Sequence, residues 1–220
     1  MLSFFRRSMD VLREETRKAA TFENMRWRKE LPLLEISKKE DLENWIVGSD
    51  KDIGGFSTAK LELSPEGKGH FHGYLSLDLP EQLDIKKSGY AGFRSKNPPS
   101  TLWGNQYWDT TPFRYLAVRV KGDHRKYFVN LQTDGYVKTD LFQHRLFLKK
   151  PGDWETIMIP FRDFILTNNG VIQNRQVDMY REKVKNFGFS IIDRQEGPFS
   201  LEIDWIKAMN TEDTDGDVDI

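Results

Sequence analysis

The sequence predicts an all-β fold, an antiparallel β-sandwich preceded by an amphipathic helix. Two observations carry this prediction. After Pro32 the apolar residues recur with a period of two, which is the spacing of a strand that buries one face. Turn-forming stretches separate these series and no helical segments alternate with them, so a parallel α/β sheet is not expected. A sandwich of about ten strands fits this spacing.

Each expected strand has one apolar face. In one of them Leu116, Val118 and Val120 occupy every second position, with Ala117 and Arg119 between them. The expected strands cover residues 57–63, 74–79, 89–95, 113–120, 127–132, 154–161, 184–192 and 199–209.

The two ends of the chain differ from this body, so we expect three parts: a helical segment (1–31), a β-sandwich domain (32–210) and an acidic tail (211–220). In the first part Leu2, Phe5, Met9 and Leu12 lie at three-to-four spacing, with charged residues on the other faces. The segment is Arg-rich like a mitochondrial presequence, although it also contains acids. We expect it to pack on the sandwich or on a partner, because its apolar stripe would otherwise be exposed. The tail has five acids and the composition of a disordered segment.

Composition excludes several function classes. The 33 basic and 34 acidic residues leave a net charge of -1, which gives no field to attract nucleic acid. The chain has no cysteine, and therefore no disulfide, thiolate zinc site or cysteine nucleophile. No apolar run approaches the length that spans a bilayer.

Motifs for catalysis, cofactors and metals are weak or absent. There is no phosphate-binding P-loop and no G-x-S-x-G hydrolase elbow, so we expect no catalytic residues and no cofactor. His70 and His72 lie two apart and would share one face of a strand. A metal site needs a third ligand, which the sequence does not nominate, so we expect no metal.

The stretch SDKDIGGFS, residues 49–57, is interpreted as a structural corner. Asp50 and Asp52 would accept backbone N–H bonds, and Gly54 and Gly55 would allow positive φ or close chain approach. Losing either carboxylate is expected to cost about 1 kcal/mol. A second structural turn is expected at Gly122 and Asp123.

The long connection NPPSTLWGNQYWDTTPF, residues 97–113, is the candidate partner-binding loop. Long ordered loops are often functional, and large aromatic residues anchor interfaces. Trp103 and Tyr107 are the expected anchors, whereas Trp108 is expected to close the end of the sandwich as part of the core.

Five blocks of the chain together resemble the complex I intermediate-associated protein 30 family. They are SDKDIGGFS, FHGYLSLDL, YLAVRVKGDHRKYFVNLQT, GDWETIMIPFRDF and EGPFSLEIDWIKA, in family order from about residue 45 to 209. The family's acid pair before Gly-Gly is here split by Lys51, and its Gly-Asp-Gly-Arg is here Gly122-Asp123-His124-Arg125.

The resemblance implies a galactose-binding-like jelly roll that acts as a non-enzymatic assembly factor, or chaperone, for mitochondrial respiratory complex I. The implied partners are membrane-arm subunits and other assembly factors, with no nucleic acid. The implied location is the mitochondrial matrix, peripheral to the inner membrane through these partners. Two alternatives remain open. One is a carbohydrate-binding module, in which Trp103, Tyr107 and Trp108 stack on sugars; the other is a sandwich-type hydrolase that uses paired carboxylates.

Overall fold

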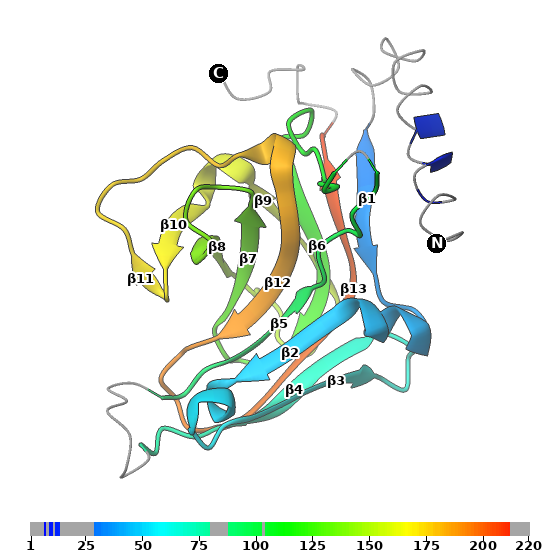
Figure 1. The fold of residues 1–220 in the computed structure, drawn as a ribbon. Helices are drawn as coiled ribbons and strands as arrows, with labels where there is room; N and C mark the ends of the chain where they lie inside the picture. Colours follow the sequence, from blue (N-terminus) through cyan, green and yellow to red (C-terminus); the bar gives the residue numbers. More distant parts are fainter. Residues whose placement is uncertain are drawn as a thin grey trace.

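Figure 1 shows a computed structural model, which describes residues 7, 9, 10, 12, 13, 29–79, 88–102 and 104–211. Two antiparallel sheets pack face to face, which confirms the predicted β-sandwich. The strands are β1 (Glu30–Glu35), β2 (Trp45–Ser49), β3 (Thr58–Leu63), β4 (Gly69–Leu75), β5 (Ala91–Ser95), β6 (Tyr115–Gly122), β7 (Tyr127–Thr133), β8 (Asp140–Leu146), β9 (Glu155–Pro160), β10 (Ile165–Asn168), β11 (Val171–Ile172), β12 (Val184–Ile191) and β13 (Gly197–Met209). The 3-10 helices are η1 (Lys39–Asn44), η2 (Asp50–Ile53), η3 (Phe161–Asp163) and η4 (Arg181–Lys183).

The smaller sheet is organised around β13. Its order is β3-β4-β13-β6-β9, and β1 also pairs with β13. The first half of β13 pairs with β4 and the second half with β1, while β6 occupies the opposite edge. The register shifts at Asp204, whose carbonyl accepts a bond of 3.1 Å from the N–H of Ile36. This bulge lets one strand change partners along a single edge.

The larger sheet has seven strands in the order β11-β10-β8-β7-β12-β5-β2. Strand β7 shows the alternation clearly: Tyr127, Val129 and Leu131 are completely buried, whereas Asn130 and Gln132 on the other face are partly exposed. Successive side chains of a strand point to opposite faces, so the apolar series packs on the facing sheet.

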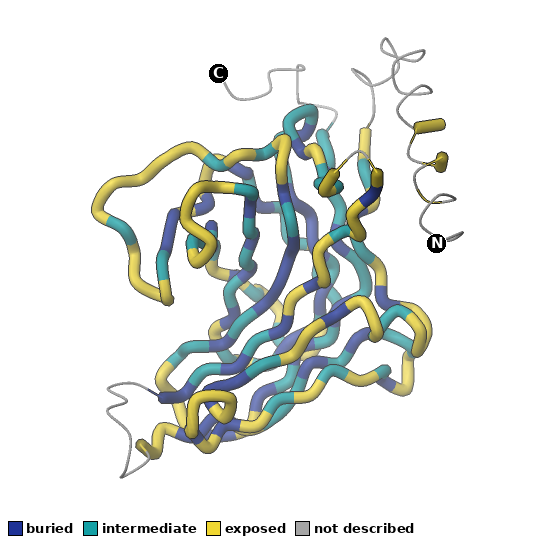
Figure 2. Tube along the Cα trace, in the orientation of Figure 1, coloured by how far each residue is buried: buried dark blue, intermediate teal, exposed yellow. Residues whose placement is uncertain are grey.

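Aromatic side chains fill the space between the sheets. The rings of Phe71 and Phe199 from the smaller sheet contact each other, and Phe71 also contacts Phe93 from the larger one. Phe93 in turn stacks on Phe189 at 5.4 Å and meets the edge of Trp45 at 5.2 Å. Figure 2 accordingly shows buried residues along the strands of both sheets.

One predicted strand was misplaced at both ends, because the strand expected over residues 74–79 is β4, Gly69–Leu75, and several strands were not predicted. The strand expected over residues 74–79 ends at Leu75, and Leu77 and Leu79 are exposed. The hydroxyl of Ser76 accepts a bond from the N–H of Asp78 and so replaces the ladder with a local turn. The alternating pattern of the sequence did not predict five of the described strands: β1, β2, β8, β10 and β11.

The described part of the N-terminal segment is helical at residues 7, 9, 10, 12 and 13, where Met9 and Leu12 are exposed. The rest of residues 1–28 and the acidic tail from residue 212 lie outside the described residues. In the described parts of the chain, no helix has both the length and the apolar character needed to cross a membrane.

Candidate functional site

Asp50 anchors the corner that the sequence indicated. The residue is completely buried and accepts three bonds, from the N–H and hydroxyl of Ser57, both at 2.9 Å, and from the N–H of Gly89 at 2.5 Å. The N–H of Ser76 reaches the Ser57 hydroxyl at 3.0 Å. One carboxylate therefore joins η2, the start of β3 and the segment before β5. Burial and this charge together raise the pKa of Tyr90.

The other three residues of this corner have separate tasks. Asp52 is exposed and accepts one bond, 3.2 Å from the N–H of Ser49, in the capping box of η2. Gly54 has φ of 96° and ends η2 in the left-handed region that favours glycine. At Gly55 the reason is different: a Cβ there would lie 2.4 Å from Cγ of Asp50. The surrounding backbone thus encloses Asp50, and the three hydrogen-bond donors to its carboxylate come from Ser57 and Gly89.

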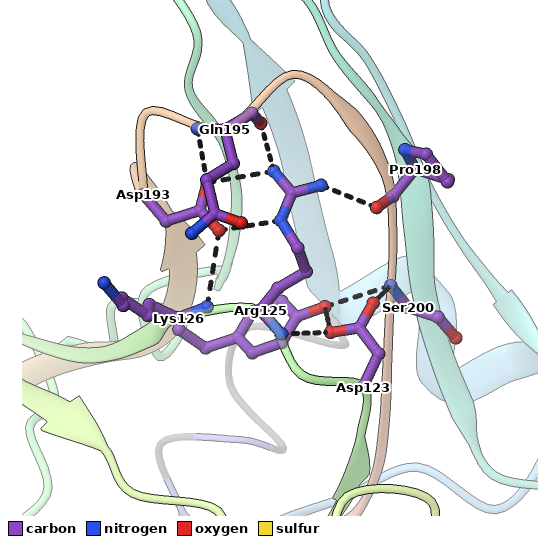
Figure 3. A network of polar contacts seen from close by, with 8 residues as sticks. Asp123, Arg125, Lys126, Asp193, Gln195, Pro198 and Ser200 are labelled. Atoms are coloured by element: carbon purple, nitrogen blue, oxygen red, sulfur yellow. Dashed lines mark hydrogen bonds and ion pairs between the residues drawn. The ribbon is translucent and has the colours of Figure 1, made fainter.

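Asp123 and Arg125 form a second polar centre, shown in Figure 3, between the turn that joins β6 to β7 and strand β13. Asp123 accepts bonds from the N–H of Arg125 and the hydroxyl of Tyr127, both at 2.9 Å, and from the N–H of Ser200 at 2.8 Å. Burial and the Asp123 carboxylate raise the pKa of Tyr127. The neighbouring Gly122 is buried, and a Cβ there would lie 2.6 Å from Leu148.

Arg125 pairs in bidentate geometry with Asp193, at 2.7 and 2.9 Å. It also donates to the carbonyl oxygens of Pro198, at 2.6 Å, and of Gln195. Burial acts to raise the pKa of Asp193, but the bonds from Arg125 and from backbone N–H groups outweigh it and lower that pKa. The guanidinium therefore ties the β6–β7 turn to the β12–β13 connection (Figure 3).

The candidate partner-binding loop is fixed to the sandwich at both ends, by Asn97, which accepts a bond of 3.0 Å from the side-chain amide of Asn186, and by Tyr107 and Trp108. The backbone of Trp108 forms an antiparallel β-bridge with Val184. Its ring meets the ring of Phe187 edge-on, with centroids 5.3 Å apart, and packs against the hydrophobic core. Tyr107 is partly exposed and its hydroxyl donates to Asp134 at 2.7 Å. Trp103, the other expected anchor, lies outside the described residues.

A chain of polar side chains on the outer face of the larger sheet was not found from the sequence. Thr167 donates to Gln143 at 2.8 Å, Gln143 to Asn130 at 2.7 Å, and Asn130 to Ser190 at 3.0 Å. The four residues come from β10, β8, β7 and β12, so only strand pairing brings them together. The sole sequence signal was the polar residue at alternate positions of β7.

The two histidines share a strand face, as expected, and their rings stack at 4.4 Å. His70 contacts the Ser200 hydroxyl at 2.8 Å, and His72 lies 3.4 Å from Glu62. Burial lowers the pKa of His70. Within the described residues, no three His, Asp or Glu side chains are grouped so as to hold a metal ion.

Solved structures with this fold include carbohydrate-binding modules. The family 11 module of the cellulase Lic26A-Cel5E of Clostridium thermocellum matches with a TM-score of 0.56 at 16% identity, over 83% of this chain and 95% of the module. The agarase AgWH50C matches with a TM-score of 0.54 at 11% identity, over 84% of this chain and 25% of the enzyme. These identities support a shared fold alone, which defines the class: a β-sandwich of the jelly-roll kind.

Sequence comparison defines the family within that class. The model of the complex I intermediate-associated protein 30 (CIA30) family matches residues 34–203, and the chain belongs to this family. The mitochondrial complex I intermediate-associated protein 30 of Neurospora crassa is 39% identical over 99% of this chain and 87% of its own length. The relatives of the same name from Drosophila melanogaster and Mus musculus are 37% and 34% identical over 75% and 78% of this chain. The aligned regions span 58% and 54% of those longer relatives.

Proposed function

We propose that this protein is a non-enzymatic assembly factor, a chaperone for mitochondrial respiratory complex I that binds membrane-arm assembly intermediates. The observation that carries the proposal is the 39% identity to the Neurospora crassa complex I intermediate-associated protein 30, which extends over 99% of the chain. The proposed location is the mitochondrial matrix, peripheral to the inner membrane, in keeping with relatives that are labelled mitochondrial.

The polar centres of the site support a structural reading of its carboxylates. Asp50 and Asp123 both accept their bonds from backbone N–H groups and hydroxyls of the sandwich itself. A nucleophile or general base needs access to a substrate, and Asp50 is completely buried. We assign partner binding instead to the connection 97–113, through Tyr107 and Trp103.

Complementation tests the assembly role. The chain is expressed in a fungal strain that lacks its own relative, and assembled complex I is measured on native gels with an in-gel NADH dehydrogenase assay. We expect assembled complex I to return, and membrane-arm subunits to co-purify with the chain from an arrested assembly stage. A chain that reaches mitochondria but leaves complex I unassembled would contradict the proposal.

One observation favours a second candidate, a polyol-binding module. Planar amides such as that of Asn130 bind hydroxyl groups well; Asn130 is partly exposed on the outer sheet face, and the buried Gln143 beside it donates to its side chain. Isothermal titration with mixed-linkage glucan and agarose oligosaccharides separates the candidates. Saturable binding that disappears in Asn130→Ala and Gln143→Ala would support the module, and no heat change would exclude it for these sugars.

A further inference from the structure

We propose that two neighbouring loop tips of the larger sheet form a docking surface for an apolar polypeptide segment flanked by carboxylates. The surface consists of Tyr136, Val137, Val171 and Ile172, and we call it the hairpin patch. We take the partner to be a complex I subunit or assembly factor, and this identity rests on the proposed function.

The two tips are adjacent because β8 and β10 are paired strands. Tyr136 and Val137 lie in the connection between β7 and β8, and Val171 and Ile172 form β11, which pairs with β10. The side-chain amide of Asn168 donates to Thr139 and to Asp140, both at 2.8 Å, and so joins the β10–β11 turn to the β7–β8 connection. The strand pairing and these two bonds therefore bring the two loop tips next to each other.

Both tips have an internal frame of hydrogen bonds. The N–H of Asp140 donates to the carbonyl of Val137 at 3.2 Å, and Gln132 donates to the carbonyl of Lys138 at 2.6 Å. Asn169 and Gly170, with φ of 48° and 73°, form the tight turn between β10 and β11. A surface that is already ordered loses little conformational entropy on binding.

The patch has the composition of an interface core. Tyr136 is fully exposed, at 104% of its reference area, and Val171 and Ile172 are 57% and 62% exposed. The Tyr136 hydroxyl makes no hydrogen bond to any described residue. Exposed aromatic and β-branched side chains grouped in this way mark interaction surfaces, and tyrosine is enriched at their energetic centres. Figure 2 shows β11 and the segment after it as largely exposed, whereas Leu166 and Thr167 of β10 are buried.

The charges around the patch decide between possible occupants. Lys138 and Arg175 are exposed and make no ion pair with any described residue, and Asp178 nearby is also unpaired. A basic cluster that holds a protein on anionic lipid has about four to eight Lys or Arg residues, and this rim has two. A partner segment with one or two carboxylates beside its apolar residues would complement both the apolar patch and the two cations, Lys138 and Arg175.

The hairpin patch also continues the surface assigned to the partner-binding loop. Tyr107 donates to Asp134, which precedes Tyr136 by two residues and pairs with Lys185 at 2.6 Å. A segment bound at Tyr107 would therefore reach Tyr136 along the same end of the sheet.

Photo-crosslinking identifies the occupant. A benzophenone amino acid replaces Tyr136 in the full chain, which is expressed in mitochondria arrested in complex I assembly, and crosslinked peptides are identified by mass spectrometry. We expect an apolar peptide with neighbouring Asp or Glu from a complex I subunit or assembly factor. Crosslinks only to another copy of this chain, or only to lipid, would overturn the inference.

Paired variants give the quantitative test. Tyr136→Ser with Val171→Ser should lower the yield of co-purified complex I subunits about tenfold or more, while the melting temperature stays that of the wild type. Phe56→Ser, which alters an exposed aromatic residue beside β3 in the other sheet, is the matched control and should leave the yield unchanged. If the wild type captures intermediates and the paired variant captures them equally, the hairpin patch is not the docking surface. If the wild type captures none, the proposed function itself fails.

Discussion

At the scale of single residues, Asp50 and Asp52 lie two positions apart and differ in almost every physical respect. Asp50 is buried and accepts three bonds, whereas Asp52 is exposed and accepts one from Ser49. The equal effects expected from the sequence should therefore separate. Asp50→Ala leaves the buried N–H groups of Ser57 and Gly89 without an acceptor and should lower the free energy of unfolding by about 3 kcal/mol. Asp52→Ala should lower it by about 1 kcal/mol. Urea unfolding of both variants makes the comparison, and equal midpoints would contradict it.

Gly55 is predicted to be intolerant of any side chain, for a steric reason. The sequence predicted that the Gly54-Gly55 pair allows positive φ or close chain approach, and the structure divides the two: Gly54 has the positive φ and Gly55 the close approach. A Cβ at Gly55 would instead lie 2.4 Å from Asp50, whose side chain is held by its own bonds and cannot withdraw freely. Gly55→Ala should cost about 1–3 kcal/mol by overpacking. The control is Gly135→Ala, where φ is not in the left-handed region and the atom nearest to a Cβ would lie 3.9 Å away. Thermal unfolding that ranks Gly135→Ala as the more damaging change would argue against this account.

At the scale of elements, the Arg125–Asp193 pair should make stability depend on pH. The pKa of Asp193 is lowered in the folded protein, so its contribution is complete above the unfolded value of about 3.9 and is lost as pH falls through the folded value. Asp193→Asn should lower the free energy of unfolding by about 2–3 kcal/mol at pH 7. The gap to the wild type should narrow as pH falls below about 4. Urea unfolding at pH 7, 5 and 3 measures this difference in the free energy of unfolding. A difference that stays constant with pH would show that the Arg125–Asp193 pair does not couple stability to protonation.

The connection 97–113 should separate into a packing part and a surface part. Trp108→Ala removes a ring that packs on Phe187 and should cost about 3 kcal/mol. Tyr107→Phe removes one bond to Asp134 and should cost about 1 kcal/mol. Chemical unfolding of the two variants, read by tryptophan fluorescence for Tyr107→Phe and by circular dichroism for both, provides the values. A Trp108→Ala protein as stable as Tyr107→Phe would mean that the ring is not part of the core.

At the scale of the whole molecule, the sequence predicted the fold class because alternation is a local property. Strands such as β7 and β13 bury one face along their length, and the period of two records this directly. Strands β10 and β11 are too short for a period to show, and β2 ends in glycine and serine. Sheet order and the polar chain from Thr167 to Ser190 depend on pairings between distant segments, which no local pattern records.

Contacts between distant segments also explain which parts of the candidate site could not be predicted from the sequence. The corner at Asp50 could be located from its turn residues, but its partner Gly89 lies 39 positions away. Likewise, the turn at Asp123 was visible in the sequence, whereas Asp193, the ion-pair partner of Arg125, comes from another connection. Composition identifies residues suited to a turn and leaves open which of them the fold will bury.

The place of β13 has a consequence for the order in which the molecule is made. It is the last strand of the sandwich to leave the ribosome, yet β1, β4 and β6 all pair with it. Until it arrives, β4 and β6 each have a free edge, and β1 has no partner strand among the described residues. The smaller sheet therefore closes only after all the other described strands have been synthesised. Such late, long-range pairing is slow and leaves edges open to aggregation. A protein proposed to assist assembly would thus itself depend on protection during its own synthesis.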